Sequence, residues 1–214
     1  LFLSACLKGS LSDGHWLMLG DFCNQNIYTE SGGIDLLKDN YGHFTSAVLR
    51  DNCRNTPRIV AAFKQICELD ENLYKSILRT DNGEDAHWQS YDSKNGQHDL
   101  LKSVIKRQRK KYPDNEIVIL SPHKDGCAGK ISGSSLNKVL SGNINSSNAV
   151  RYTTIHSFKG LEAQSIILTD IEEFEGERAE KLFYVAASRA TSELTVLYDK
   201  SAVDQLMKIL SKGG

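Results

Sequence analysis

The segment RYTTIHSFKGLEAQSIILTD, residues 151–170, is the most informative stretch of this chain. Two strand-forming runs, residues 151–155 and 165–170, enclose a short polar loop. Gly160 lies in this loop, and glycine permits a close approach of the backbone to a ligand. The segment therefore predicts two strands joined by a loop that could bind a ligand.

Strand-forming and helix-forming segments alternate along the rest of the chain. Apolar or alternating runs predict strands at residues 15–19, 44–49, 116–120 and 193–198. Apolar residues at helical spacing predict helices from residue 57 and at residues 100–112, 177–189 and 201–211, the first with Thr56 as N-cap and Pro57 in its first turn. This alternation predicts an α/β fold with a mostly parallel sheet and helices on both faces. Ligands bind such sheets at the carboxyl ends of the strands, where we expect the polar motifs to lie.

Three polar stretches carry weaker predictions. Residues 80–99 are predicted to be a loop with a short strand near Trp88, and residues 121–149 to be loops around a short helix near residues 136–140. The basic run KRQRKK, residues 106–111, suits the C-terminal end of a helix dipole. We prefer this interpretation of the basic run to a contact with DNA.

Composition is that of an ordinary globular protein. The 214 residues are 40% hydrophobic and 25% charged. Because the net charge is only −1, any contact with nucleic acid must be local or shared with another domain. No apolar run approaches the ~18 residues of a membrane span, and we expect no membrane contact. Five cysteines without metal-ligand spacing predict reduced thiols in a cytoplasmic protein and no metal site. Because the chain lacks an initial Met, we expect it to be part of a longer protein.

Four motifs carry the functional signal. In chain order they are WLMLGDFCNQNIY at residues 16–28, LRDNCRNTPRI at 49–59, TTIHSFKGLE at 153–162 and YVAASRA at 184–190. Together they resemble the C-terminal half of a superfamily 1 helicase of the UvrD/Rep type, and more closely the shorter bacterial UvrD-like helicases without a large inserted subdomain. The resemblance implies a RecA-like fold of the P-loop NTPase type.

The resemblance implies that five residues serve an ATP site. Gln25 would sense the γ-phosphate, Arg54 would contact it, and Arg189 would be the arginine finger that neutralises charge on the transferred phosphoryl group. Gly160 and Glu162 would reach the nucleotide, Glu162 through a ribose hydroxyl. A competing interpretation of Arg189 is a cap at the end of its own helix.

The same resemblance assigns contacts with single-stranded DNA to Thr154, His156, Ser157 and Lys159. Because one loop would then touch both ligands, the nucleotide state could alter the grip on DNA. The chain departs from the family pattern at Cys53, which replaces an adenine-stacking aromatic residue, and in the spacing before Gln25, which is one residue longer.

The phosphate-binding half of an ATP site is missing. The nearest candidate, GCAGKI at residues 126–131, lacks a first glycine because Lys124 stands there, and Ile131 replaces the hydroxyl that binds Mg²⁺, so we predict an ordinary loop. We find no apolar strand that ends in an Asp-Glu pair. We therefore expect ATP and Mg²⁺ to bind mainly to an N-terminal RecA-like domain of the same polypeptide, and this chain alone to be inactive. Residues 1–40 are assigned to a remnant of that domain and residues 41–214 to the second RecA-like domain.

Two functional hypotheses remain. The first is the C-terminal portion of an ATP-dependent DNA helicase or translocase. The second is a degenerate, non-catalytic helicase domain that binds nucleic acid or a protein. Cys53 and the shifted Gln25 favour the second slightly, whereas the intact charged residues Arg54, Glu162 and Arg189 argue against it. A free-standing nucleotide-binding protein is disfavoured because the chain has no glycine-rich phosphate cradle.

Overall fold

The computed structural model describes residues 49–69, 73–132, 136 and 138–212, together with the single residues 17, 45 and 47. The chain divides into two units, residues 1–49 and 50–214, and all strands and helices of the described residues belong to the second unit. Gln25, most of the predicted strand at residues 15–19 and half of the predicted strand at residues 44–49 lie outside the described residues.

The second unit is built on a six-stranded sheet in which every pairing is parallel. The strands, in the order β3-β8-β7-β4-β6-β5 across the sheet, are His87–Tyr91, Ala190–Asp199, Ala163–Ile171, Ile117–Ser121, Val150–Thr154 and Leu140–Ser141. All five residues of β4 are buried, as expected for a parallel strand covered on both faces. The predicted α/β fold, with its mostly parallel sheet, is confirmed.

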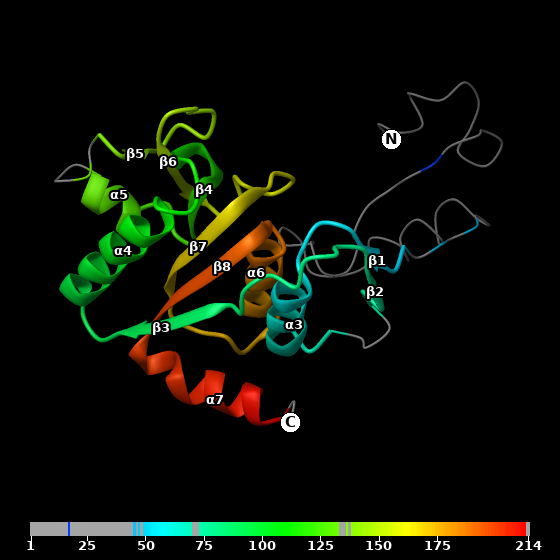
Figure 1. Cartoon of the computed structure of the whole chain (residues 1–214). Helices are drawn as coiled ribbons and strands as arrows, with labels where there is room; N and C mark the ends of the chain where they lie inside the picture. The colour runs from blue at the N-terminus through cyan, green and yellow to red at the C-terminus, as the bar shows by residue number, and fades with distance from the viewer. Residues whose placement is uncertain are drawn as a thin grey trace, which may run out of the picture. The chain divides into compact units, whose positions relative to one another are not determined.

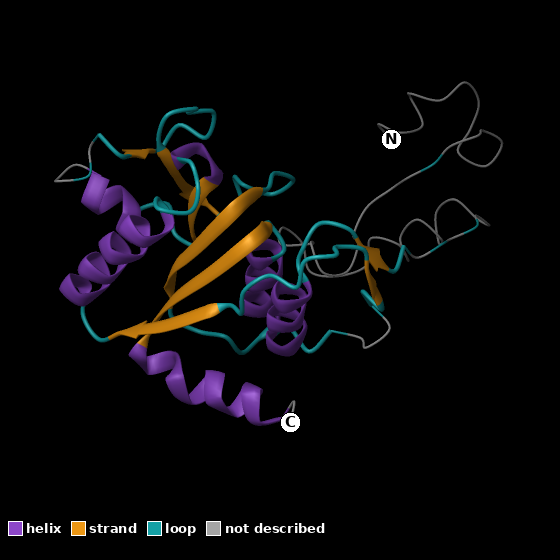
Figure 2. Ribbon diagram, viewed as in Figure 1, coloured by secondary structure: helices purple, strands orange, loops and turns teal. Residues whose placement is uncertain are grey.

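Helices cover both faces of this sheet (Figures 1 and 2). On one side lie α4 (Lys94–Gln108) and α5 (Cys127–Ser132), and on the other lie α3 (Pro57–Ile66) and α6 (Glu177–Ala187). The last helix, α7 (Val203–Lys212), packs against α3. Short 3-10 turns, Asp114–Glu116 and Lys200–Ala202, precede β4 and α7. Within the described ranges, no helix is both long and apolar enough to span a bilayer.

The helix predicted at Thr56-Pro57 is confirmed as α3. Thr56 occupies the N-cap position and Pro57 the first turn, while Ile59 and Phe63 are among the residues that bury the apolar face. The Thr56 hydroxyl makes no cap hydrogen bond; its side chain instead packs tightly against the backbone of Gly83. A side chain at position 83 would therefore clash with Thr56.

Three predictions about the polar stretches need correction or extension. Helix α4 begins at Lys94, well before residue 100, because the Ser93 hydroxyl accepts a hydrogen bond from the Gly96 amide at 3.1 Å and caps it. The segment predicted as an ordinary loop at residues 126–131 forms α5, whereas the helix predicted near residues 136–140 is absent from the described residues there. Helix α5 forms because Cys127, Ala128 and Ile131 bury a helical face. The short strand predicted near Trp88 is confirmed as β3.

Candidate nucleotide-phosphate site

Arg54 and Glu162 meet although they are 108 residues apart. The Arg54 Nε atom lies 2.7 Å from Glu162 Oε2, and both side chains are partly exposed. Arg54 follows the two-residue strand β1 (Asp51–Asn52), which pairs in parallel with β2 (Ser76–Ile77), and Glu162 immediately precedes β7. The fold therefore brings together an arginine and a glutamate that the resemblance assigns to the nucleotide.

Arg189 lies just beyond the C-terminal end of α6 and is only 2% exposed. Its Nε donates to the Val185 carbonyl at 3.1 Å, and its Nη2 donates to Ser188 Oγ at 3.0 Å. Burial lowers the pKa of the Arg189 guanidinium, and the nearby charge of Arg54 lowers it further. In this conformation the arginine caps its own helix, and its role as a finger stays a prediction.

Two asparagines that the sequence analysis did not single out connect these segments. Asn55 Nδ2 donates to the carbonyls of Ser188 and Ala190, at 3.1 and 2.6 Å. Asn52 in turn donates to Asn55 Oδ1 at 3.0 Å. Both asparagines belong to the motif at residues 49–59, but only the fold shows that the partners of Asn55 are carbonyls more than 130 residues away.

Arg79 makes a second connection between the same two segments. Its Nη1 donates to the carbonyls of Arg54 and Thr191, both at 3.1 Å, while Asp81 accepts from the other side of the guanidinium. The hydrogen bond from Arg79 lowers the pKa of the Asp81 carboxyl, which keeps this pair charged. No sequence motif identifies Arg79.

This group lies at the amino ends of β7 and β8, which corrects the expected position at the carboxyl ends. Ala163 pairs with Ala190 at the start of the two strands, and the Ala163 amide donates to the Arg189 carbonyl at 3.1 Å. The physical reason is that β6 and β7 are both parallel to β4, so the connection between them must return to the amino end. Glu162 lies at the end of that return.

The residues predicted to contact DNA lie at the start of the same connection. Thr154 ends β6 and pairs with Ser121 at the carboxyl end of β4. Thr154 Oγ1 donates to Ser157 Oγ at 2.9 Å and accepts from the Ser157 amide at 3.2 Å, which shapes the turn. His156 and Lys159 are half-buried, and Gly160 has a left-handed φ of +90°. One loop thus runs from Thr154 at one end of the strands to Glu162 at the other.

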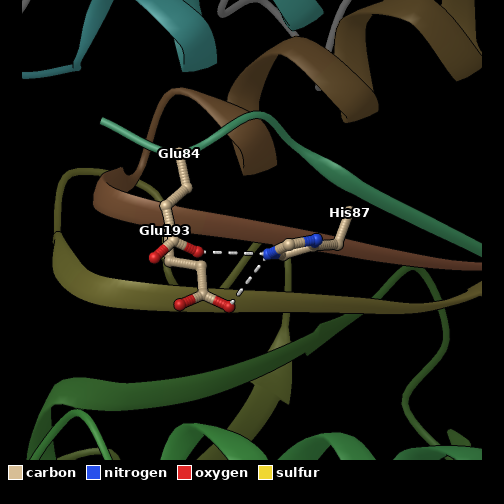
Figure 3. A group of neighbouring side chains, drawn as sticks. All are labelled: Glu84, His87 and Glu193. Atoms are coloured by element: carbon tan, nitrogen blue, oxygen red, sulfur yellow. Dashed lines mark hydrogen bonds and ion pairs between the residues drawn. The ribbon is translucent and has the colours of Figure 1, made fainter. Parts of the chain in front are cut away.

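A second charged cluster, at the start of β3 and β8, contains Glu84, His87 and Glu193 (Figure 3). Their ligand atoms lie within 4.8 Å of one another, a spacing that could hold a metal ion. However, Lys111 Nζ lies 2.8 Å from Glu84 Oε2 and 3.1 Å from Glu193 Oε2, and Arg107 Nη2 lies 3.3 Å from Glu193 Oε1. Protein cations already neutralise these carboxylates, so we interpret the cluster as structural.

Residues of the basic run 106–111 form ion pairs with this cluster and with the turn that follows it in the chain. Arg107 and Lys111 neutralise Glu193, which is fully buried, and Arg109 pairs with Asp114 at 2.8 Å. Part of the run is therefore engaged in ion pairs within the domain, which the sequence analysis did not predict.

A family model matches part of this chain. Residues 149–197 match the model of the UvrD-like helicase C-terminal domain. This region runs from β6 into β8 and contains the motifs at residues 153–162 and 184–190. A similar solved structure is the C-terminal domain of a possible DNA helicase from Lactobacillus plantarum WCFS1, with a TM-score of 0.54 and 17% identity. The match covers 73% of this chain and 93% of that one, and at this identity it shows the fold alone. A search of curated proteins found no match.

Proposed function

We propose that this chain, whose residues 149–197 match the UvrD-like helicase C-terminal domain, is the second RecA-like domain of an ATP-dependent DNA helicase or translocase. The observation that carries the proposal is the convergence of Arg54, Glu162 and Arg189, from three separate segments, at the amino ends of β7 and β8. Two guanidiniums and one carboxylate suit phosphate oxygens and a sugar hydroxyl better than they suit a metal ion. ATP and Mg²⁺ would be bound mainly by an N-terminal RecA-like domain of the same polypeptide, in the cytoplasm.

The ion pair between Arg54 and Glu162 suits exchange with a phosphate. Partly exposed pairs of this kind contribute only about 0–1 kcal/mol, so a phosphate oxygen could replace the carboxylate at Arg54. Glu162 would then be available to accept a hydrogen bond from a ribose hydroxyl. Arg189 would have to leave the Val185 carbonyl to reach the transferred phosphoryl group.

Coupling to DNA would run through the loop between β6 and β7. Thr154, His156, Ser157 and Lys159 would contact single-stranded DNA, and Gly160 and Glu162 would contact the nucleotide. Because these residues lie in one continuous connection, a movement of Glu162 toward the nucleotide would shift the turn built by Thr154 and Ser157. Opening and closing of the site would thereby alter the grip on DNA.

The test is Arg189→Ala in the full-length polypeptide. We expect DNA-stimulated ATP hydrolysis to fall to less than about a tenth, because an arginine finger acts on the transition state, while single-stranded DNA binding stays within about twofold. The matched control is Arg178→Ala, which removes an exposed arginine from the first turn of α6, the helix that precedes Arg189, and should leave both properties unchanged. Hydrolysis above about a tenth of the wild-type rate in the Arg189 variant would refute the finger assignment.

A non-catalytic helicase domain is the second candidate function. The observation that favours it is Cys53, which is exposed beside Arg54 and offers no aromatic surface for a base. In this case the full-length polypeptide would bind single-stranded DNA or a protein but would hydrolyse no ATP, with or without DNA. Measurable DNA-stimulated hydrolysis that depends on Arg54 would exclude it.

A further inference from the structure

Asn55 is fixed more completely than any capping role requires. It is 1% exposed, and each of its side-chain groups has a partner: Nδ2 donates to the carbonyls of Ser188 and Ala190, and Oδ1 accepts from Asn52. The side-chain oxygen of Asn52, Oδ1, also accepts hydrogen bonds from the backbone amides of Arg54 and Asn55, at 3.0 and 2.9 Å. The loop that carries Arg54 is therefore held from inside.

The two carbonyls that Asn55 engages lie on either side of Arg189 in the chain. Arg79 adds a second cross-link, from the Arg54 carbonyl to the Thr191 carbonyl. Two independent sets of hydrogen bonds thus tie the backbone around Arg54 to the backbone around Arg189. Side-chain hydrogen bonds with fully satisfied partners are the kind that fix a unique geometry.

Holding two arginines close together is unfavourable without such a connection. Their like charges repel, and the charge of Arg54 helps to lower the pKa of Arg189. The cross-links fix the backbone positions from which the two arginine side chains extend.

We infer that Asn55, supported by Arg79, is a positioning residue that sets the spacing of Arg54 and Arg189 so that both can reach one terminal phosphate group. This inference rests on the proposed function, since it assigns both arginines to the same phosphate. An amide is required at position 55 because only an amide both donates to two carbonyls and accepts from Asn52. Asp of the same shape would place a carboxylate against the Ser188 and Ala190 carbonyl oxygens.

The experiment compares variants of the full-length polypeptide. Asn55→Ala should lower kcat for DNA-stimulated ATP hydrolysis by at least about tenfold. The preference of this variant for a non-hydrolysable ATP analogue over ADP, measured as the ratio of the two affinities, should fall by at least about fivefold, because only the analogue carries the terminal phosphate. Asn55→Asp should be at least as severe. Arg79→Ala should lower the same preference by at least about twofold. This variant leaves the buried Asn52 amide paired with Asn55, so it keeps the test valid if the Asn55 variants fold poorly.

The matched control is Gln97→Ala. Gln97 is also a buried amide whose Nε2 donates to two acceptors, Thr169 Oγ1 and Asp170 Oδ1, but at the carboxyl end of β7. It should cost similar thermal stability while the preference for the ATP analogue over ADP stays within about twofold of wild type. A purely structural role for Asn55 would give the same result as Gln97→Ala and would overturn the inference.

Arg54→Ala and Arg189→Ala complete the series. In the Arg54→Ala background, Asn55→Ala should lower the preference for the ATP analogue by less than it does in the wild type, because part of its effect acts through Arg54. If both arginine variants lose hydrolysis but Asn55→Ala and Arg79→Ala keep the preference, the positioning role alone is wrong. If both arginine variants retain hydrolysis, the proposed function is wrong and the inference falls with it.

Discussion

Gly160 is the residue in the motif loop whose backbone no other amino acid adopts without strain. Its φ is +90°, and an added Cβ would meet no atom within 4 Å, so the obstacle to a side chain is conformational and not steric. Gly160→Ala should therefore lower the free energy of unfolding of this chain by about 1–2 kcal/mol, measured by urea denaturation.

The chain offers a matched control at Gly129. This glycine lies inside α5 with an ordinary helical φ, and an added Cβ would lie 3.5 Å from the Tyr152 ring. Gly129→Ala should be neutral or should stabilise the chain by up to about 1 kcal/mol, because alanine favours the helix. A loss at Gly129 equal to that at Gly160 would show that the left-handed backbone is not the cause.

At the scale of elements, the end of α4 is held against β8 by charge as well as by apolar packing. Lys111 lies in the turn after α4 and contacts both Glu84 and the fully buried Glu193. Gln108 on the same helix donates to Glu193 Oε1 at 3.3 Å and to Thr195 Oγ1 at 2.9 Å. A buried carboxylate that loses one of its cations is destabilising even when its other partners remain.

Lys111→Met should therefore lower the free energy of unfolding at pH 7 by about 1–3 kcal/mol, measured by urea denaturation. The control, Lys181→Met, breaks the pair with Glu177, whose carboxylate is largely exposed in the first turn of α6, and should cause no measurable change. An equal effect of the two substitutions would contradict the role given to the buried Glu193.

The effect of Lys111→Met should also depend on pH. The hydrogen bond from Lys111 lowers the pKa of Glu84 below its ordinary value of 4.5. A lowered carboxyl pKa contributes stability above that ordinary value, and the contribution is lost as pH falls through the folded-state pKa. The difference between wild type and Lys111→Met should therefore narrow below about pH 4.5; a difference that widened there would contradict the assignment.

At the scale of the whole molecule, the predicted ligand residues occupy the two ends of one sheet. The arginine group lies at the amino ends of β7 and β8, and the predicted DNA residues begin at the carboxyl end of β6. The described arginine group offers phosphate-binding side chains but no metal-binding set. The expectation that a second domain completes the ATP site stays a prediction.

The corresponding prediction is that this chain alone hydrolyses no ATP, with or without single-stranded DNA. Addition of the N-terminal RecA-like domain as a separate polypeptide should restore DNA-stimulated hydrolysis that depends on Arg189, because an arginine finger can be supplied from a second chain. Phosphate release is the measurement, and Arg189→Ala in the same mixture is the control. Clear turnover by the chain alone would show that it carries a complete ATP site of its own.

Most of the helices and strands of the second unit can be predicted from the amino-acid sequence, and the motifs supply the candidate site residues. Apolar periodicity placed β4, β6, β7, β8 and most of the helices, because burial against both faces of a parallel sheet requires that pattern. The start of α4 and the position of α5 were missed, because a serine cap and a short buried face outweighed the polar, glycine-containing composition of those segments.

Which residues meet, and at which end of the sheet they lie, depends on the tertiary structure. The return of the connection from β6 to β7 puts Glu162 beside Arg54 at the amino ends, and no local pattern encodes that direction. Asn55 and Arg79 act on carbonyl groups, and every residue has a carbonyl, so sequence alone cannot identify their partners. The ion pairs of the buried Glu193 also depend on the tertiary structure, because Arg107 and Lys111 come from a distant segment that packing brings beside it.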